Sequence, residues 1–354
     1  MFKAAIHRLQ TPPFRRCDIA GMSPSMTTPD VPDHPFTADE AYTMGFTPTT
    51  LRWLARCGEI RHLLYGVYVP GSWPDDVGSR AAAAAHVMPR HAVVTDRSAA
   101  SLFGIDVHDY AEIPEVPSLE MVSINGAQPS RRTGIRGGKR DLLPDEIMDL
   151  HGVLVTVPAR TACDIACMLG RHRAIATLDA FRTKLDLTQH DFSRLLPRFV
   201  GRRGVIQLRE LIPLSRTGVD SQPESWIRID LHDAGYPMPE PQLRTFVPGW
   251  GMVRIENAYP ELRMAVEYDG EEHHSEDEDR EHDHQRREAA RAAAGWHIVV
   301  VRRDGFSRRG NERWLSEFAR IWAERAPGPA GKRRYARAQL SGRPSLRRRG
   351  SRRR

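Results

Sequence analysis

The residues best suited to chemistry are two carboxylates at the end of an apolar segment that reads Leu-Arg-Met-Ala-Val-Glu-Tyr-Asp-Gly over 262–270. Side chains alternate between the two faces of a strand, so Glu267 and Asp269 are expected on the same face. Two like charges placed there are unfavourable unless a cation, a proton or a partner neutralises them. The pattern therefore predicts a catalytic or metal-binding pair.

A third carboxylate, Glu256, lies near the end of the preceding predicted strand. If the two strands form a hairpin, it comes to lie beside Glu267 or Asp269. Carboxylate oxygens suit Mg²⁺, which can bind a scissile phosphate and activate a water molecule. His274 follows shortly after and could orient or deprotonate that water. The alternative is that this histidine belongs to the charged, solvated run 271–283.

These residues must be positioned by one compact α/β core near the C-terminus. Hydrophobic periodicity and the glycine and proline positions predict a helix, three strands, a second helix and a fourth strand. The predicted ranges are 224–234, 242–247, 253–259, 263–268, 278–294 and 297–302. We place the whole domain at 220–325.

The first ordered region has the signals of a winged helix-turn-helix over 35–72. A capping box, Thr37 with Glu40, predicts one helix, and Thr47 followed by Pro48 predicts the start of a second. Two short strand-like segments follow. The candidate DNA-binding residues are Arg52, Arg56, Arg61 and His62. Ordinary solvated charges on a small helical unit are the alternative interpretation.

Helices and strands alternate over 73–215, which predicts a middle α/β domain and makes the whole chain a multi-domain α/β protein. This domain contains a basic cluster of Arg131, Arg132, Arg136, Lys139 and Arg140. The cluster is equally consistent with a contact to phosphate and with a solvated loop. The glycines nearby lack the spacing of a phosphate-binding loop. Residues 1–34 and 326–354 are expected to be disordered tails.

The net charge of +7 comes from the C-terminal tail, because 326–354 holds one Lys and ten Arg without any Asp or Glu. Without those eleven charges, 41 basic and 45 acidic residues remain, a net of −4. Such a tail attracts polyanions without reading sequence. The four cysteines lack zinc spacing, and no apolar stretch is long enough to span a membrane, so we expect a cytoplasmic protein.

Several strings resemble bacterial endonuclease domains related to very short patch repair endonucleases, of the PD-(D/E)XK superfamily. They are Glu256 to Glu261, Val266 to Gly270 with His274, and Arg280, Asp283, Arg286-Arg287 and Gly295-Trp296. The resemblance implies a Mg²⁺ or Mn²⁺ cofactor held by Glu256 and Asp269. It also implies catalytic roles for Glu267, Asp269, His274 and the helical Glu224. Two departures are Glu256, where the family usually has Asp, and Asp269, where the superfamily has Lys.

The first two-thirds of the chain resembles actinobacterial proteins with an AbiEi-type antitoxin region, a winged helix followed by an α/β domain. The resemblance rests on 37–69, 95–100 and 157–164. It implies promoter DNA and a nucleotidyltransferase toxin as partners. Two functions remain open from the sequence: a metal-dependent DNA endonuclease, and a non-catalytic DNA-binding regulator or antitoxin that keeps the nuclease fold as a scaffold.

Overall fold

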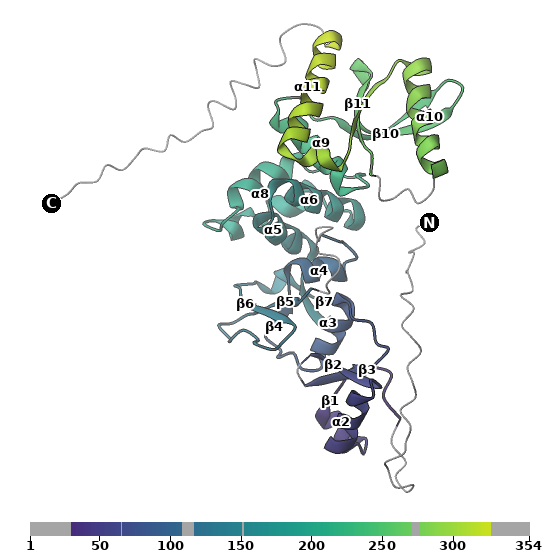
Figure 1. Cartoon of the computed structure of the whole chain (residues 1–354). Coiled ribbons are helices and arrows are strands. Elements are labelled where there is room, and N and C mark those ends of the chain that lie inside the picture. Colours follow the sequence, from purple (N-terminus) through teal and green to yellow (C-terminus); the bar gives the residue numbers. More distant parts are fainter. Residues whose placement is uncertain (1–29, 65, 108–116, 151, 271–276, 327–354) are drawn as a thin grey trace, which may run out of the picture. The chain divides into compact units, whose positions relative to one another are not determined.

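The structure is a computed structural model, and it describes residues 30–64, 66–107, 117–150, 152–270 and 277–326 (Figure 1). Contacts group the described residues into two units. The first comprises residues up to Val94 with those in 110–143 and 149–155, and the second comprises those in 95–109, 144–148 and from Thr156 onward. The domain boundaries expected after 72 and near 215–220 fall inside these units. Most of both expected tails lies outside the described residues.

The first unit begins with two short helices and a three-stranded sheet in the order β1-β3-β2. Thr37 and Glu40 form the expected capping box at the first helix, and Thr47 caps the second, which has Pro48 in its first turn. The elements are β1 (Phe36–Thr37), α1 (Ala38–Thr43), α2 (Pro48–Arg56), β2 (Ile60–Leu64) and β3 (Val67–Pro70). Phe36, Phe46 and Leu51 belong to their common core.

A five-stranded mixed sheet follows in the order β6-β5-β4-β8-β7. The strands are β4 (Ala92–Val94), β5 (Leu119–Ser123), β6 (Ile135–Lys139), β7 (Ile147–Leu150) and β8 (Val153–Thr156), and α3 (Val77–Ala85) precedes them. The basic segment expected to be a loop in fact contributes Arg136 and Lys139 to strand β6, where parallel pairing with β5 satisfies the backbone. The Arg136 guanidinium lies 3.5 Å from Glu120.

The second unit opens with a layer of helices around a core of Phe181, Phe192 and Phe199. The helices are α4 (Asp96–Leu102), α5 (Pro158–Met168), α6 (Arg171–Leu185), α7 (Gln189–Ser193) and α8 (Val205–Leu211). Within this layer, Arg160 is buried between Glu146 and Asp164, at 2.6 and 2.8 Å. None of the described helices combines the length and apolarity needed to cross a membrane.

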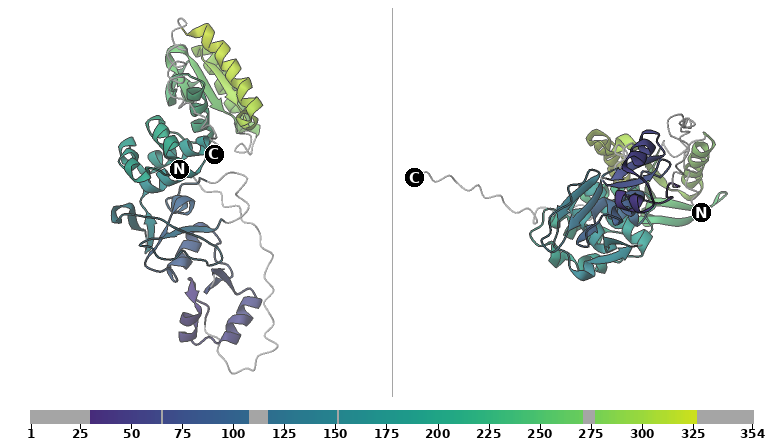
Figure 2. Two further views of the ribbon diagram at one scale, coloured as in Figure 1. Left: turned by 90° about the vertical axis from the view of Figure 1, so that its left-hand side faces the viewer. Right: turned by 90° about the horizontal axis from the view of Figure 1, so that it is seen from below.

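The C-terminal part of the second unit holds a four-stranded sheet in the order β12-β11-β10-β9. Its elements are α9 (Gln222–Asp233), β9 (Glu240–Val247), β10 (Gly251–Tyr259), β11 (Met264–Tyr268), α10 (Asp277–Ala294), β12 (His297–Val301) and α11 (Arg308–Arg325). The predicted order of helix, three strands, helix and strand is confirmed. Helix α10 packs on one face of the sheet, and α9 and α11 pack on the other (Figures 1 and 2).

Candidate functional site

Three glutamates from three different elements converge beside the C-terminal sheet. Glu224 comes from α9, Glu256 from β10 and Glu267 from β11. Burial, and then the charges of Glu224 and Glu267, raise the pKa of the Glu256 carboxyl well above its usual range. Glu224 and Glu267 are themselves only 4% and 1% exposed. The structure therefore brings together three of the carboxylates singled out from the sequence.

Each of these carboxylates is held by hydrogen bonds from its surroundings. Glu224 accepts from the Ser221 hydroxyl at 2.8 Å and from the Gln242 amide at 2.6 Å. Ser221 is also the cap of α9, so the start of this helix fixes the first glutamate in place. One oxygen of the Glu256 carboxylate accepts a hydrogen bond from the Tyr268 backbone N–H at 2.7 Å. At this end of the β10–β11 ladder, the carboxylate thus replaces the backbone carbonyl that would otherwise accept from this N–H.

The positive charge beside the cluster comes from Arg286 on α10. Its guanidinium donates two hydrogen bonds to Glu267, at 3.2 Å to Oε1 and 2.8 Å to Oε2. A fork of this kind matches a carboxylate in both geometry and charge. The Arg286 guanidinium also donates a hydrogen bond to the backbone carbonyl of Arg254 at 3.2 Å. Like charges on one strand face were expected to need a neutralising partner. For Glu267 that partner is the Arg286 side chain.

Asp269 lies in a separate charged environment. Its carboxylate is 3.6 Å from Arg287 of α10 and 3.6 Å from Arg302, just beyond β12. These groups face a hollow of about 460 Å³, which is also lined by His284, Glu288, Arg291, Asp304 and Arg313. Glu267 and Asp269 therefore have separate guanidinium partners. His274 lies outside the described residues.

The predicted metal site can be tested against this geometry. Within the described ranges, no group of three or more His, Cys, Asp or Glu side chains is arranged to hold a metal ion. Of the two residues assigned to the ion, Glu256 accepts a hydrogen bond from the Tyr268 backbone N–H at 2.7 Å, and Asp269 lies 3.6 Å from both Arg287 and Arg302. The described contacts give no arrangement of these two residues around Mg²⁺ or Mn²⁺, so we assign no chemical step to an ion.

The raised pKa of Glu256 predicts how stability depends on pH. Its folded pKa lies above the unfolded value, so its contribution to stability is full below the unfolded pKa and is lost as pH rises through the folded pKa. Glu256→Gln removes this titration and keeps an acceptor for the Tyr268 N–H. We expect the variant to gain stability relative to wild type as pH rises, measured by urea unfolding across pH. Parallel pH curves for the two proteins would contradict this account.

The N-terminal unit separates the four predicted DNA-binding residues into two pairs. Arg52 and Arg56 are exposed on α2, whose opposite side buries Leu51 and Leu54. Arg61 is instead held within the unit, since its guanidinium donates to the Trp73 carbonyl at 2.7 Å. The exposed ring of His62 packs on Tyr68, with ring centroids 4.1 Å apart. Arg61 and His62 therefore contact other segments of the unit, and Arg52 donates to the carbonyl of Pro48 in its own helix at 3.1 Å.

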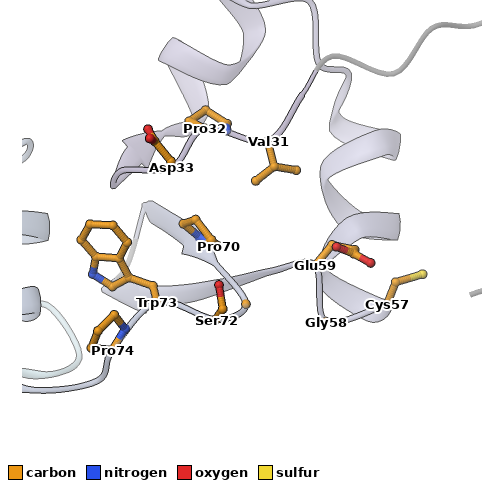
Figure 3. A pocket seen from close by; sticks show the side chains of 11 residues that line it. Val31, Pro32, Asp33, Cys57, Gly58, Glu59, Pro70, Ser72, Trp73 and Pro74 are labelled. Atoms are coloured by element: carbon orange, nitrogen blue, oxygen red, sulfur yellow. The ribbon is translucent and has the colours of Figure 1, made fainter. Parts of the chain in front are cut away.

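A hollow of about 460 Å³ lies next to these strands (Figure 3). Its wall is mainly proline, glycine and the Trp73 ring, and its charged lining residues are both acidic, Asp33 and Glu59. Negative walls repel phosphate, so this hollow is unsuited to a nucleic-acid backbone. Gly71 is required at its edge, because a Cβ there would meet the Gly58 carbonyl oxygen at 1.9 Å. The exposed side of α2 remains the better candidate for DNA contact.

Sequence reasoning gave no role to the arginines that dominate both charged environments. Arg286, Arg287 and Arg302 face carboxylates 19, 18 and 33 residues away in the chain. Local periodicity carries no information at that separation. The adjacent Arg286-Arg287 pair was visible as a motif, and only the packing of α10 on the sheet shows that its two members face different carboxylates.

Comparison with known proteins places the chain among relatives of unknown activity. Two uncharacterized proteins, from two strains of Mycobacterium tuberculosis, are each 33% identical over 245 residues, which is 69% of this chain and 86% of each relative. No solved structure matches. Residues 91–214 match the family described as AbiEi antitoxin C-terminal domain. The chain therefore belongs to the same protein family as these two mycobacterial proteins and contains an AbiEi antitoxin C-terminal domain.

Proposed function

We propose that this protein is a DNA-binding regulator of the antitoxin type. The observation that carries the proposal is the AbiEi antitoxin match over 91–214, preceded in the chain by a helix, a turn, a second helix and a strand pair. That order is the plan of a winged helix-turn-helix, in which the second helix enters the major groove. Here the second helix is α2, and its exposed Arg52 and Arg56 supply positive charge.

The test is binding to the promoter region of the gene itself. We expect the protein to prefer that duplex over a mixed-sequence duplex in fluorescence anisotropy. Arg52→Ala/Arg56→Ala should weaken promoter binding and lower the slope of log K against log salt by about one for each phosphate contact removed. Arg209→Ala, an exposed arginine on α8, is the matched control and should bind as wild type. Equal affinity for both duplexes would refute the regulator.

A toxin partner follows from the same proposal. An antitoxin must oppose a toxin, and the AbiEi resemblance points to a nucleotidyltransferase. Co-expression with a nucleotidyltransferase encoded next to this gene should restore growth that the enzyme alone prevents. Arg52→Ala/Arg56→Ala should still rescue, because the proposal gives toxin neutralisation to the segment that matches the antitoxin family, 91–214. If growth remains arrested when both proteins are expressed, the proposal that this protein neutralises a nucleotidyltransferase toxin is refuted.

A second candidate function is phosphodiester hydrolysis by the C-terminal sheet region. The convergence of Glu224, Glu256 and Glu267 from three elements favours it, since buried like charges are retained at a cost in stability. The bidentate contact from Arg286 weighs against it. The test is cleavage of plasmid and mismatched duplexes with Mg²⁺ or Mn²⁺, comparing wild type with Glu267→Gln and Asp269→Ala. Equal cleavage by all three would show that activity arises elsewhere.

A further inference from the structure

The tip of the β9–β10 hairpin presents an exposed face of unusual composition. Phe246 and Met252 are direct cross-strand partners and are 63% and 66% exposed. The next pair on the same face is Arg244 opposite Arg254, both exposed. We refer to these four residues as the hairpin face. Between 241 and 255 the sequence contains these two arginines and neither Asp nor Glu.

The other face of the hairpin explains why this one is free for contact. Leu243, Val247, Val253 and Ile255 belong to the core beneath α10. Strand alternation therefore turns the hairpin face away from that core. The tip is held in place by Trp250, whose ring lies 5.1 Å from the His282 ring of α10. An exposed aromatic on a supported ribbon loses little conformational entropy on binding.

The charges decide which partner this face fits. Like charges directly opposite each other on a sheet are destabilising unless an opposite charge lies near. Arg254 is paired with Asp220 and also donates to Gln242 at 2.9 Å. The Arg244 side chain makes no hydrogen bond or ion pair with the described part of the chain. Docking of a second copy of this face would bring further arginines into the same patch, so self-association through it is disfavoured. A polyanion is therefore favoured as the binding partner of this face.

We infer that the hairpin face is a second contact with double-stranded DNA, separate from α2. A two-stranded ribbon fits a duplex groove, and exposed Phe and Met side chains can enter between base steps while arginines hold the flanking phosphates. Phe246 and Met252 would supply the apolar wedge, and Arg244 would contact a phosphate. This inference rests on the proposed DNA binding and adds a contact made by the C-terminal region.

The experiment uses the full chain and a mixed-sequence duplex that carries 2-aminopurine. We expect Phe246→Ala/Met252→Ala to weaken duplex binding about tenfold and to abolish the fluorescence rise that unstacking produces. Arg244→Ala should lower the salt slope by about one. Val200→Ala and Ile206→Ala, at apolar residues 74% and 70% exposed, are matched controls and should bind as wild type. Thermal melting followed by circular dichroism should be unchanged in all variants.

Two outcomes would overturn the inference. One is wild-type affinity, fluorescence and salt slope in the hairpin variants. The other is a loss confined to single-stranded DNA, which would mean that the face binds unpaired bases. Failure of the promoter test is distinguishable, because the hairpin variants are judged on a duplex without a promoter sequence. If the protein shows no preference for its promoter but its duplex affinity still depends on Phe246, the hairpin inference stands and the proposed regulator function is refuted.

Discussion

Arg286→Ala is expected to lower the free energy of unfolding by about 3 kcal/mol, because it leaves a buried carboxylate without its counter-ion. Glu267 is 1% exposed, and both of its oxygens accept from this one guanidinium. Removing the arginine also increases the net negative charge around Glu256 and Glu224. The loss should be measured by urea unfolding followed by circular dichroism.

The pH dependence of that loss has a defined sign. Arg286 lowers the pKa of the neighbouring Glu256, which burial and the other glutamates raise, so removing this arginine raises that pKa further and protonation then favours the folded state. The difference between wild type and variant should therefore be largest at neutral pH and shrink as pH falls below the unfolded pKa. Arg286→Met/Glu267→Leu removes both charges and should recover most of the stability.

A control on the same helix separates this effect from a general loss of charge. Arg291 pairs with Glu288 at 2.9 Å, and both side chains are about half exposed. Arg291→Ala should change stability by less than about 1 kcal/mol. If Arg286→Ala unfolds at the same urea concentration as Arg291→Ala, Arg286 is not the counter-ion of the glutamate cluster.

Local sequence signals predicted the elements of this fold well where the signal was a helix cap or an alternating strand. Thr37 and Glu40 form the capping box expected from their spacing, and Thr47 caps α2 as predicted. Apolar alternation located β10 and β11 to within two residues. These signals succeed because hydrogen bonding within a few residues and burial of one face determine them.

Side-chain partners were predicted less well, because they depend on packing between distant elements. Alternation correctly indicated that Glu267 and Asp269 leave β11 on the same side, but it could not show that α10 supplies a different arginine to each. Arg61 was predicted to contact DNA, and its spacing in the sequence gave no sign that its guanidinium donates to the Trp73 carbonyl. Strand β6 was missed because its Gly137-Gly138 pair has weak β-propensity.

Asp179→Ala is expected to have the largest effect on stability, about 4 kcal/mol, because it leaves Arg228 buried without a counter-ion. The two side chains are 1% and 0% exposed and form an ion pair between α6 and α9. Asp179 also accepts from the Ser225 hydroxyl and from the Arg216 backbone N–H, both at 2.7 Å. One substitution therefore leaves several buried donors unpaired.

This ion pair also joins two parts of the chain that the comparisons distinguish. Helix α6 lies within the AbiEi match over 91–214, and α9 begins the C-terminal region after it. If the pair couples them, wild type should show one unfolding transition for both, and Asp179→Ala should show two in hydrogen exchange. Asp179→Asn keeps one side-chain oxygen, which can still accept from the Arg216 backbone N–H, so this variant should lose less stability than Asp179→Ala.

The control for this coupling is a partly exposed pair between the same two helices. Arg171 donates to Asp233 at 2.6 Å, with side chains 30% and 39% exposed. Arg171→Ala should cost less than about 1 kcal/mol and leave a single transition, because solvent screens the pair. Equal losses from Arg171→Ala and Asp179→Ala would contradict the role of burial. A single transition in Asp179→Ala would mean that apolar packing couples the helical layer to the C-terminal sheet without help from this ion pair.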